Sequence, residues 1–477
     1  MKQLYSAIPL AQTIVESCAQ LGVEHVVISP GSRNAPLTIG FSNHPKVKTY
    51  SVVDERCAGF FALGIAQQLR KPVAVVCTSG SALLNYYPAV SEAFYSDIPL
   101  VVISADRPSH LIDIGDGQTI RQEKAIDKHV LYSACLKEDN RIGDNTEIQS
   151  FNEQELSKAF AISLDQQGPV HINAPFDEPL YGKAEALSVS LDFLKKLNFQ
   201  AQPKDISTTF IRHWNQAKRR MVLVGAQHPS EAITQDLTPF ALDESTIVFT
   251  EVTSNVHHPN FFTSIDSIVA PIEKSTQKEA LFSALQPDIV VTIGGMIVSK
   301  KVKAFLRKYK PKQHYHIDPK KAYDTFFASP IHIQLAPAVF FEQVKTELKS
   351  ISSPYRSEFF KLQNKMNLHL ANYVKQVPFS DFTVFYELIK LMPTHLHVQN
   401  ANSSTIRYAN LFPKHPTHEV FCNRGTSGID GSTSTAIGAS LAQLKPTLFV
   451  TGDLSFLYDS NALWNNYVPT NFKLIIE

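Results

Sequence analysis

The sequence predicts an α/β fold built from parallel β-sheets, and three observations support this fold class. Short apolar runs rich in Val and Ile recur along the chain, at residues 25–29, 72–79, 99–105, 221–226, 247–251, 288–295, 447–453 and 472–477. Helix-like segments separate the runs, which is typical of buried parallel strands. Several runs lead directly into polar loops, SPGSRN, TSGSALLN, SADRP and GDLSF. Functional loops of parallel sheets lie at the carboxyl ends of the strands.

The length of 477 residues is too great for one hydrophobic core, so several domains are expected. We predict three doubly wound parallel-sheet domains in series, at residues 1–185, 200–350 and 355–477. Residues 168–186 close the first sheet and lead into a polar linker. The chain ends within the apolar run at 472–477, without a turn or cap, so we expect the third domain to be incomplete.

The composition excludes several classes of protein. A formal net charge of +1 gives no overall attraction to nucleic acid or to a membrane surface. The five cysteines are scattered without a C-x-x-C pair, so neither a disulfide framework nor a structural zinc site is expected. The beginning of the chain does not resemble a signal peptide, and no apolar run approaches the ~20 residues that cross a bilayer. We therefore expect a cytoplasmic protein.

The first motif with chemical potential begins at Glu55. With Ala58, Ala62 and Gly64 it forms the spacing E-x-x-A-x-x-x-A-x-G, in which small residues line the expected helix. An acid at the start of a helix is common, because the helix dipole favours negative charge there. By itself the spacing favours this ordinary interpretation over a catalytic one.

The second motif is GDLS at residues 452–455, directly after an apolar run. A carboxylate such as Asp453, with the hydroxyl of Ser455 nearby, suits a divalent cation that bridges a diphosphate. Gly-Asp pairs are also frequent in ordinary turns, so this motif alone is equally ambiguous.

Together the two motifs resemble the thiamine-diphosphate enzyme superfamily, whose pyrimidine-binding and diphosphate-binding domains contain them in this order. TSGSALLN, at residues 78–85, resembles the TSGPGATN loop of the same superfamily. Longer blocks resemble, more narrowly, a family of menaquinone-pathway synthases: SPGSRNAPL, DERCAGFFALG, SADRPSHLIDIGDGQTIRQ, NSSTIR, NRGTSGIDGSTSTAIG and GDLSFLYDSNAL. The resemblance spans all three predicted domains, and in the central one it is confined to GGMIVSKK at 294–301.

This resemblance implies thiamine diphosphate and Mg²⁺ (or Mn²⁺) as cofactors. Glu55 would be catalytic, as the carboxylate that promotes the imino tautomer of the cofactor's pyrimidine. Burial would raise the pKa of Glu55 toward proton sharing. The implied cofactor-binding residues are Glu55, Thr78, Gly80, Ile429, Gly452, Asp453 and Ser455, with Asp453 as a metal ligand. The Asn residues that complete the superfamily's metal motif would fall beyond Glu477.

The resemblance also implies a donor and an acceptor, 2-oxoglutarate and isochorismate, which each carry two carboxylates. Arginine and lysine bind carboxylates in a fixed geometry. The matching motifs supply Ser32, Arg33, Arg107, Gln118, Lys300, Asn402, Ser403, Arg407 and Arg424. Lys301 stands where the family often has Arg. A homodimer or homotetramer is implied, because the superfamily binds its cofactor between subunits.

Two alternatives stay open. The first is an acetolactate-synthase-like carboligase, which would use small neutral substrates. The arginines of SPGSRN and SADRP argue against this alternative. A catalytically silent fragment would act as a binding subunit, an alternative that the early end of the chain keeps open. A nicotinamide dehydrogenase is disfavoured, since no run is followed by G-x-G-x-x-G. Simple decarboxylation is disfavoured as well, since no histidine pair adjoins the motifs.

Overall fold

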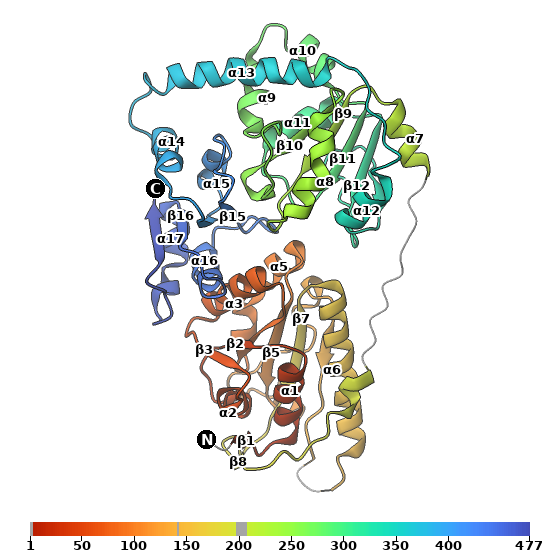
Figure 1. The fold of residues 1–477 in the computed structure, drawn as a ribbon. Coiled ribbons are helices and arrows are strands. Elements are labelled where there is room, and N and C mark those ends of the chain that lie inside the picture. The colour runs from red at the N-terminus through yellow and green to blue at the C-terminus, as the bar shows by residue number, and fades with distance from the viewer. Residues whose placement is uncertain (1–2, 141–142, 197–207) are drawn as a thin grey trace. The chain divides into compact units, whose positions relative to one another are not determined.

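The structure is a computed structural model that describes residues 3–140, 143–196 and 208–477. The chain forms two compact units (Figure 1). The first unit combines Met1–Gln200 with Gly425–Ile476, and the second comprises Ala201–Arg424 and Glu477. The predicted domain edge at residue 200 lies outside the described residues, and the division into three domains stays a prediction.

The first unit contains a six-stranded parallel sheet of order β3-β2-β4-β5-β7-β6. Its strands are β2 (His25–Ile28), β3 (Lys48–Ser51), β4 (Val73–Cys77), β5 (Leu100–Asp106), β6 (Ser133–Cys135) and β7 (Val170–Pro175). A short antiparallel pair joins β1 (Tyr5–Ser6) to β8 (Lys183–Ala184). The helices are α1 (Pro9–Gln20), α2 (Ala35–Asn43), α3 (Glu55–Leu69), α4 (Ala82–Asn85), α5 (Tyr87–Ser96) and α6 (Thr146–Gln166).

Both faces of this sheet are covered by helices, as its apolar strands require. Val26 and Ile28 of β2 pack with α1, α2 and α6 in one core. Val27, which points to the opposite face, packs with α3 and α5 in a second core. The sheet is therefore doubly wound, and polar residues are concentrated at the ends of its strands.

The first unit also contains a later part of the chain. This part comprises α16 (Ser432–Leu441), β16 (Thr447–Thr451), α17 (Asp453–Tyr458) and β17 (Phe472–Ile476). β17 pairs in parallel with β16. Ile437 of α16 belongs to the same core as α3, so the two helices pack directly on each other.

The second unit contains a five-stranded parallel sheet of order β10-β9-β11-β12-β13. Its strands are β9 (Arg220–Val224), β10 (Thr246–Thr250), β11 (Ile289–Ile293), β12 (Gln313–Ile317) and β13 (Ile331–Ile333), and β14 (His397–Asn400) pairs separately with β15 (Glu419–Phe421). The helices are α7 (Thr208–Gln216), α8 (Glu231–Leu242), α9 (Ile265–Lys274), α10 (Lys278–Leu285), α11 (Lys300–Lys308), α12 (Pro337–Val344), α13 (Tyr355–Tyr373), α14 (Asp381–Leu391) and α15 (Ser404–Ala409).

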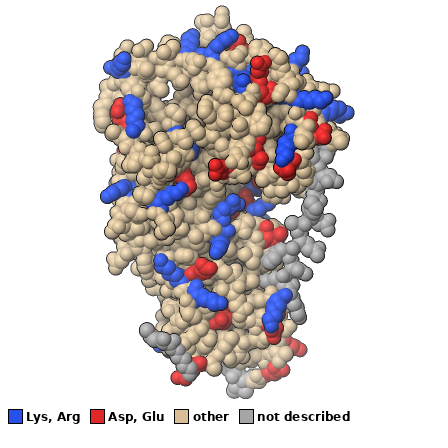
Figure 2. Space-filling model, in the orientation of Figure 1, with Lys and Arg blue, Asp and Glu red and all other residues tan. Residues whose placement is uncertain are grey.

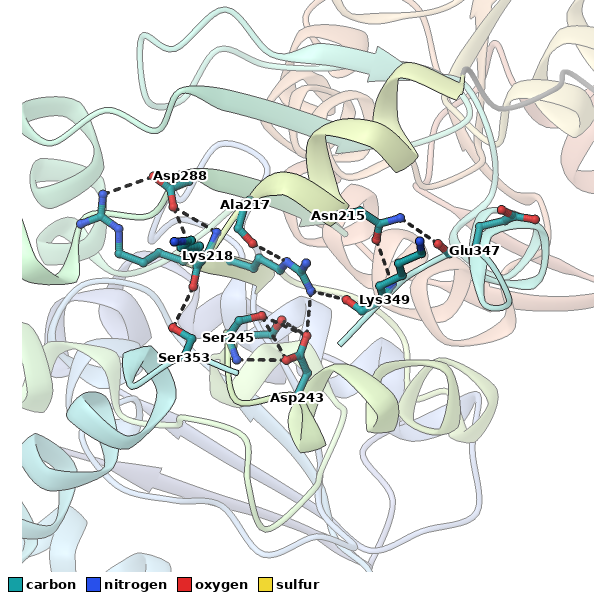
Figure 3. Close-up of polar contacts among 12 residues, drawn as sticks. Asn215, Ala217, Lys218, Asp243, Ser245, Asp288, Glu347, Lys349 and Ser353 are labelled. Atoms are coloured by element: carbon teal, nitrogen blue, oxygen red, sulfur yellow. Dashed lines mark hydrogen bonds and ion pairs between the residues drawn. The ribbon is translucent and has the colours of Figure 1, made fainter. Parts of the chain in front are cut away.

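Two ion pairs, of which Arg220–Asp243 is buried and Arg219–Asp288 is partly exposed, lie where strands β9 and β11 begin (Figure 3). Arg220 is fully buried, and its Nη1 lies 2.9 Å from Oδ2 of Asp243 and 2.8 Å from the carbonyl oxygen of Lys349. Asp288 accepts from Nη2 of Arg219 at 3.2 Å. The paired charges lower the pKa of Asp288 against the opposing effect of burial.

The prediction of an α/β fold with parallel sheets is confirmed, and all eight apolar runs contain strands. The eight apolar runs do not include the more polar or shorter strands, such as β12 (QHYHI) and β14 (HVQN). His314, His397 and Gln399 of these strands are buried by contacts with distant residues, for example His314 Nε2 with Thr292 Oγ1 at 3.0 Å. A local pattern does not contain such contacts.

The surface charge agrees with the near-neutral composition. Lys and Arg are intermixed with Asp and Glu on the face shown in Figure 2. Every helix within the described residues is too short or too polar to span a bilayer.

Candidate active site

Glu55 is the first residue of α3, and its N-cap holds it in place. The side chain of the N-cap, Asp54, accepts from the backbone N–H of Cys57 at 3.2 Å and from Nδ2 of Asn461 at 2.8 Å. These bonds fix where the helix begins. The Glu55 carboxylate is half-buried and accepts from Nδ2 of Asn85 at 3.3 Å.

Glu55 lies near the carboxyl end of β4. Burial, followed by the charge of Glu55, raises the pKa of Cys77 well above its usual value. Cys77 is the last residue of β4, and Thr78 and Gly80 follow it. The predicted acid and the predicted glycine loop therefore occupy the same end of the sheet.

The small residues of the E-x-x-A-x-x-x-A-x-G motif have a packing role. A β-carbon on Gly64 would lie 2.1 Å from the carbonyl oxygen of Thr435 in α16. Conversely, a β-carbon on Gly438 would lie 2.0 Å from the carbonyl oxygen of Phe61 in α3. The two helices thus cross in backbone contact, which positions the start of α3 and with it Glu55.

The three loops after β2, β4 and β5 meet. A β-carbon on Gly31 of the SPGSRN loop would lie 2.2 Å from Cβ of Thr78. Gly80 adopts a φ of +89°, which favours glycine, and a β-carbon there would lie 3.3 Å from the backbone of Gln118. Sequence-predicted residues of three separate motifs therefore lie together in the first unit.

Arg33 and Arg107 lie near each other at this end of the sheet. Arg33 is 6 % exposed, and its Nη1 donates to the carbonyl oxygen of Phe176 at 2.9 Å. Burial, followed by the positive charge of Arg107, lowers the pKa of Arg33. The buried Nε of Arg107 has no hydrogen-bond partner among the described residues. Two adjacent cations, one with an unused donor, suit an anionic ligand.

The diphosphate motifs also come together in the first unit. Ser455 Oγ donates to the carbonyl oxygen of Ile429 at 2.9 Å, which joins the GDLS motif to SGIDG. Asp453 is the exposed first residue of α17, after the N-cap Gly452. Its Oδ1 accepts from the backbone N–H of Leu454 at 2.7 Å.

Thiamine diphosphate fits the residues of this region. The first turn of α16 contains two buried hydroxyls, Ser432 Oγ and Thr433 Oγ1, without a hydrogen-bond partner among the described residues. Buried polar groups are nearly always hydrogen-bonded. A helix N-terminus with unused hydroxyls suits the oxygen atoms of a diphosphate. The described residues contain no cluster of three or more His, Cys, Asp or Glu for a metal. A cation at Asp453 would therefore depend on phosphate oxygens and water.

Five predicted substrate residues belong to the second unit, and two of them are in contact. Asn402 is buried, and its Oδ1 accepts from Nη1 of Arg424 at 2.7 Å. Its Nδ2 donates to the carbonyl oxygen of Asn423 at 2.7 Å. Ser403, the N-cap of α15, has a φ of +70°. The side chains of Ser403, Arg407 and Lys300 are exposed, as is that of Ser32 in the first unit.

The loop before Lys300 is held by a residue that sequence reasoning missed. Glu251 is buried and accepts from the backbone N–H groups of Val298 at 2.7 Å and Ser299 at 2.6 Å. Burial raises its pKa to about 7, and these two hydrogen bonds and the charge of Arg424 oppose the rise. Lys301 forms an ion pair with Glu273.

Lys303 is a second missed residue. Burial, followed by the positive charge of Arg424, lowers the pKa of Lys303, and Lys300 contributes to the same effect. Lys303 lies three residues after Lys300 in α11, so the two lysines occupy neighbouring positions on the helix surface. This spacing, in VSKKVK, is the signal that could have identified it.

Comparison with known proteins agrees with these features. Residues 8–129 match the thiamine pyrophosphate enzyme family in its N-terminal TPP binding domain. The matched region contains Glu55, the loop of Thr78 and Gly80, and both Arg33 and Arg107. The fold and this match define the class, and the chain is a thiamine-diphosphate enzyme.

The particular family follows from whole-chain similarity. The chain is 53 % identical to the 2-succinyl-5-enolpyruvyl-6-hydroxy-3-cyclohexene-1-carboxylate synthase of Flavobacterium psychrophilum, over 99 % of this chain and 84 % of that protein. The enzymes with the same name from Flavobacterium johnsoniae and Christiangramia forsetii are 51 % and 50 % identical, over 99 % of this chain and 83 % and 84 % of theirs. The chain belongs to this family of menaquinone-biosynthesis synthases.

Proposed function

We propose that the chain decarboxylates 2-oxoglutarate and joins the remaining four-carbon unit to isochorismate, with thiamine diphosphate and Mg²⁺ or Mn²⁺ as cofactors. The observation that carries the proposal is the pair Arg33–Arg107, next to the loop of Thr78 and Gly80. Both proposed substrates are dicarboxylates, and guanidinium groups such as those of the buried Arg33 and the partly buried Arg107 bind carboxylates strongly.

Each group of residues has a separate task in this proposal. Glu55 holds a proton at N1′ of the pyrimidine ring, as a general acid–base carboxylate. When bound, thiamine diphosphate supplies a carbon nucleophile and accepts the electrons released by decarboxylation. Asp453 binds the metal ion, and Arg33 and Arg107 bind and orient the acceptor. The exposed Lys300 and Arg407 bind carboxylates that enter from solvent.

Assembly and location are part of the proposal. We expect a homodimer or homotetramer, because the thiamine-diphosphate enzymes that this chain resembles bind their cofactor between subunits. Light scattering on the purified protein tests this expectation. None of the five cysteines, all of which are described residues, forms a disulfide, and this supports a reducing compartment such as the cytoplasm.

The decisive experiment is incubation of the protein with thiamine diphosphate, Mg²⁺, 2-oxoglutarate and isochorismate, followed by mass spectrometry of the product. The expected product retains the acceptor carbon skeleton plus a succinyl group, and CO₂ is released. Omitting the cofactor or adding a chelator should abolish it. Turnover with pyruvate but not with 2-oxoglutarate would instead support the acetolactate-synthase-like alternative.

A further inference from the structure

A hydrogen-bond network connects Gly80 to Arg107 across the strand ends of the first unit. The backbone N–H of Gly80 donates to Oε1 of Gln122 at 2.7 Å, and Nε2 of Gln122 donates to Oδ1 of Asn173 at 2.9 Å. Nδ2 of Asn173 donates to Oδ2 of Asp106 at 2.8 Å. Oδ1 of Asp106 accepts from the backbone N–H of Arg107 at 2.8 Å.

The direction of every hydrogen bond in this network is determined by which groups can donate and which can accept. The N–H of Gly80 can only donate, so the oxygen of the Gln122 amide must face it. The nitrogen of Gln122 then faces Asn173, and the nitrogen of Asn173 faces the carboxylate of Asp106. Reversing either amide would place two donors or two acceptors opposite each other.

The hydrogen-bond network lies where one face of the sheet changes from apolar to polar. Leu100 and Val102 of β5 belong to the α3 core, and Ser104, two residues further on, points to the same face. Ser104 Oγ donates to Oδ1 of Asn173 at 2.7 Å and lies 2.8 Å from Nε2 of His171. Burial lowers the pKa of His171 to about 4, so the ring is neutral and its Nε2–H donates to Ser104.

Gln122 is the central member, because it connects three backbone segments. It is 1 % exposed, and its Nε2 also lies 3.3 Å from the carbonyl oxygen of Ala105. It belongs to the loop between β5 and β6 that includes Gln118, against which Gly80 packs. Satisfied buried polar networks rigidify the segments that they join.

The geometry points to Gln122 as a positioning residue that, through Asn173 and Asp106, holds the cofactor loop at Gly80 in register with the acceptor-binding residue Arg107. This inference rests on the proposed function. Gln122 touches neither substrate nor cofactor in this role, and acts through the two loops that it connects.

The test compares Gln122→Met with Gln12→Met in the full chain. Gln12 is equally buried in the first unit and also forms hydrogen bonds through both amide atoms, but with Ser6 and Ser188. Both variants should lose similar thermal stability. Only Gln122→Met should raise the KM for isochorismate and weaken thiamine diphosphate binding, each by about tenfold, because a buried donor loses its partner. Calorimetry measures cofactor binding independently of turnover.

A double-mutant cycle identifies the route of the effect. If Gln122 acts through Arg107, its substitution should change the KM for isochorismate little in an Arg107→Ala background. An undiminished effect in that background would overturn the inference, as would equal KM and cofactor affinity in Gln122→Met and the wild type.

Gln122→Glu provides a conservative variant. A protonated carboxyl keeps both hydrogen bonds of the amide, whereas a carboxylate cannot donate to Asn173. Burial of position 122, together with the negative charge of Asp106 behind Asn173 and of the adjacent Glu123, favours the protonated form. The KM for isochorismate should therefore approach the wild-type value at low pH and rise with pH. A KM ratio between variant and wild type that does not change with pH would overturn the inference.

The two proposals fail in different ways. A wild-type chain that binds thiamine diphosphate but makes no product from 2-oxoglutarate and isochorismate contradicts the proposed function. Even then, cofactor binding equal in Gln122→Met and the wild type overturns the positioning inference, and binding weakened only in Gln122→Met supports it.

Discussion

Gly64 of α3 lies directly against the backbone of Thr435 in α16, so closely that an added β-carbon would be 2.1 Å from the carbonyl oxygen. Backbone cannot move aside as a flexible side chain can. We predict that Gly64→Ala lowers the free energy of unfolding by at least about 1–3 kcal/mol, the usual cost of overpacking. Urea unfolding measures this. Gly117→Ala is the control, because a β-carbon there meets no atom within 4 Å; equal losses would contradict the packing argument.

Glu55→Gln should leave the thermal unfolding temperature nearly unchanged and remove most activity. The amide retains the size of the carboxylate but cannot hold a proton at the pyrimidine nitrogen. The measurement is the rate of C2 proton exchange on bound thiamine diphosphate by NMR. Exchange at the wild-type rate in the variant would show that Glu55 is an ordinary helix-start acid.

Arg33→Ala and Arg107→Ala should impair acceptor use more than donor decarboxylation. Loss of a charge-assisted hydrogen bond in a buried site costs about 1.5–3 kcal/mol, which is roughly tenfold or more in KM for isochorismate. Steady-state kinetics with each substrate varied separately measures the difference. An unchanged isochorismate KM together with a collapsed rate of 2-oxoglutarate decarboxylation would reassign both arginines to the donor.

Asp243→Ala should strongly destabilise the second unit, because it leaves the fully buried Arg220 without its ion-pair partner. Breaking a buried pair in this way costs about 3–5 kcal/mol. Glu342→Ala removes the exposed ion pair with Lys345 and should cost no more than about 1 kcal/mol. Denaturant unfolding of both variants tests the contrast, which similar losses would contradict.

Glu251 should make stability depend on pH. Burial raises its pKa from 4.5 to about 7 in the folded chain, so between these values the folded state binds a proton that the unfolded state does not. Its contribution to stability is therefore greatest at low pH and decreases as pH rises through this range. Glu251→Gln should lack this slope, so the difference in free energy of unfolding between wild type and variant should change with pH across this range. Urea unfolding at several pH values measures it, and parallel curves would contradict the assignment.

Much of the fold could be predicted because its signals are local. Each apolar run is long enough to form a strand, and all eight runs do so, although β17 is only partly buried. The motif residues that begin or end these elements, such as Glu55 and Asp453, were likewise identified from sequence. The position of Asp453 follows directly from where the apolar run at 447–453 stops.

The packing role of Gly64 and the buried polar residues could not be predicted in the same way. His171 and Asn173 alternate with apolar residues in VHINAP, a pattern that resembles a strand with one face in water. Both residues are in fact buried, because helices cover both faces of the sheet. Glu251 was missed for the same reason, since its burial depends on segments distant in sequence.

By itself, then, the sequence determined the class of fold, the strands, the motif residues and the family resemblance, because each depends on residue type and short-range spacing. Only the tertiary structure decided which of these residues are connected. Gly80 and Gln122 are 42 residues apart, and Gln122 and Asn173 are 51 apart. Their hydrogen bonds form only when β4, β5 and β7 pair in one sheet, since a hydrogen bond requires its donor and acceptor within about 3 Å.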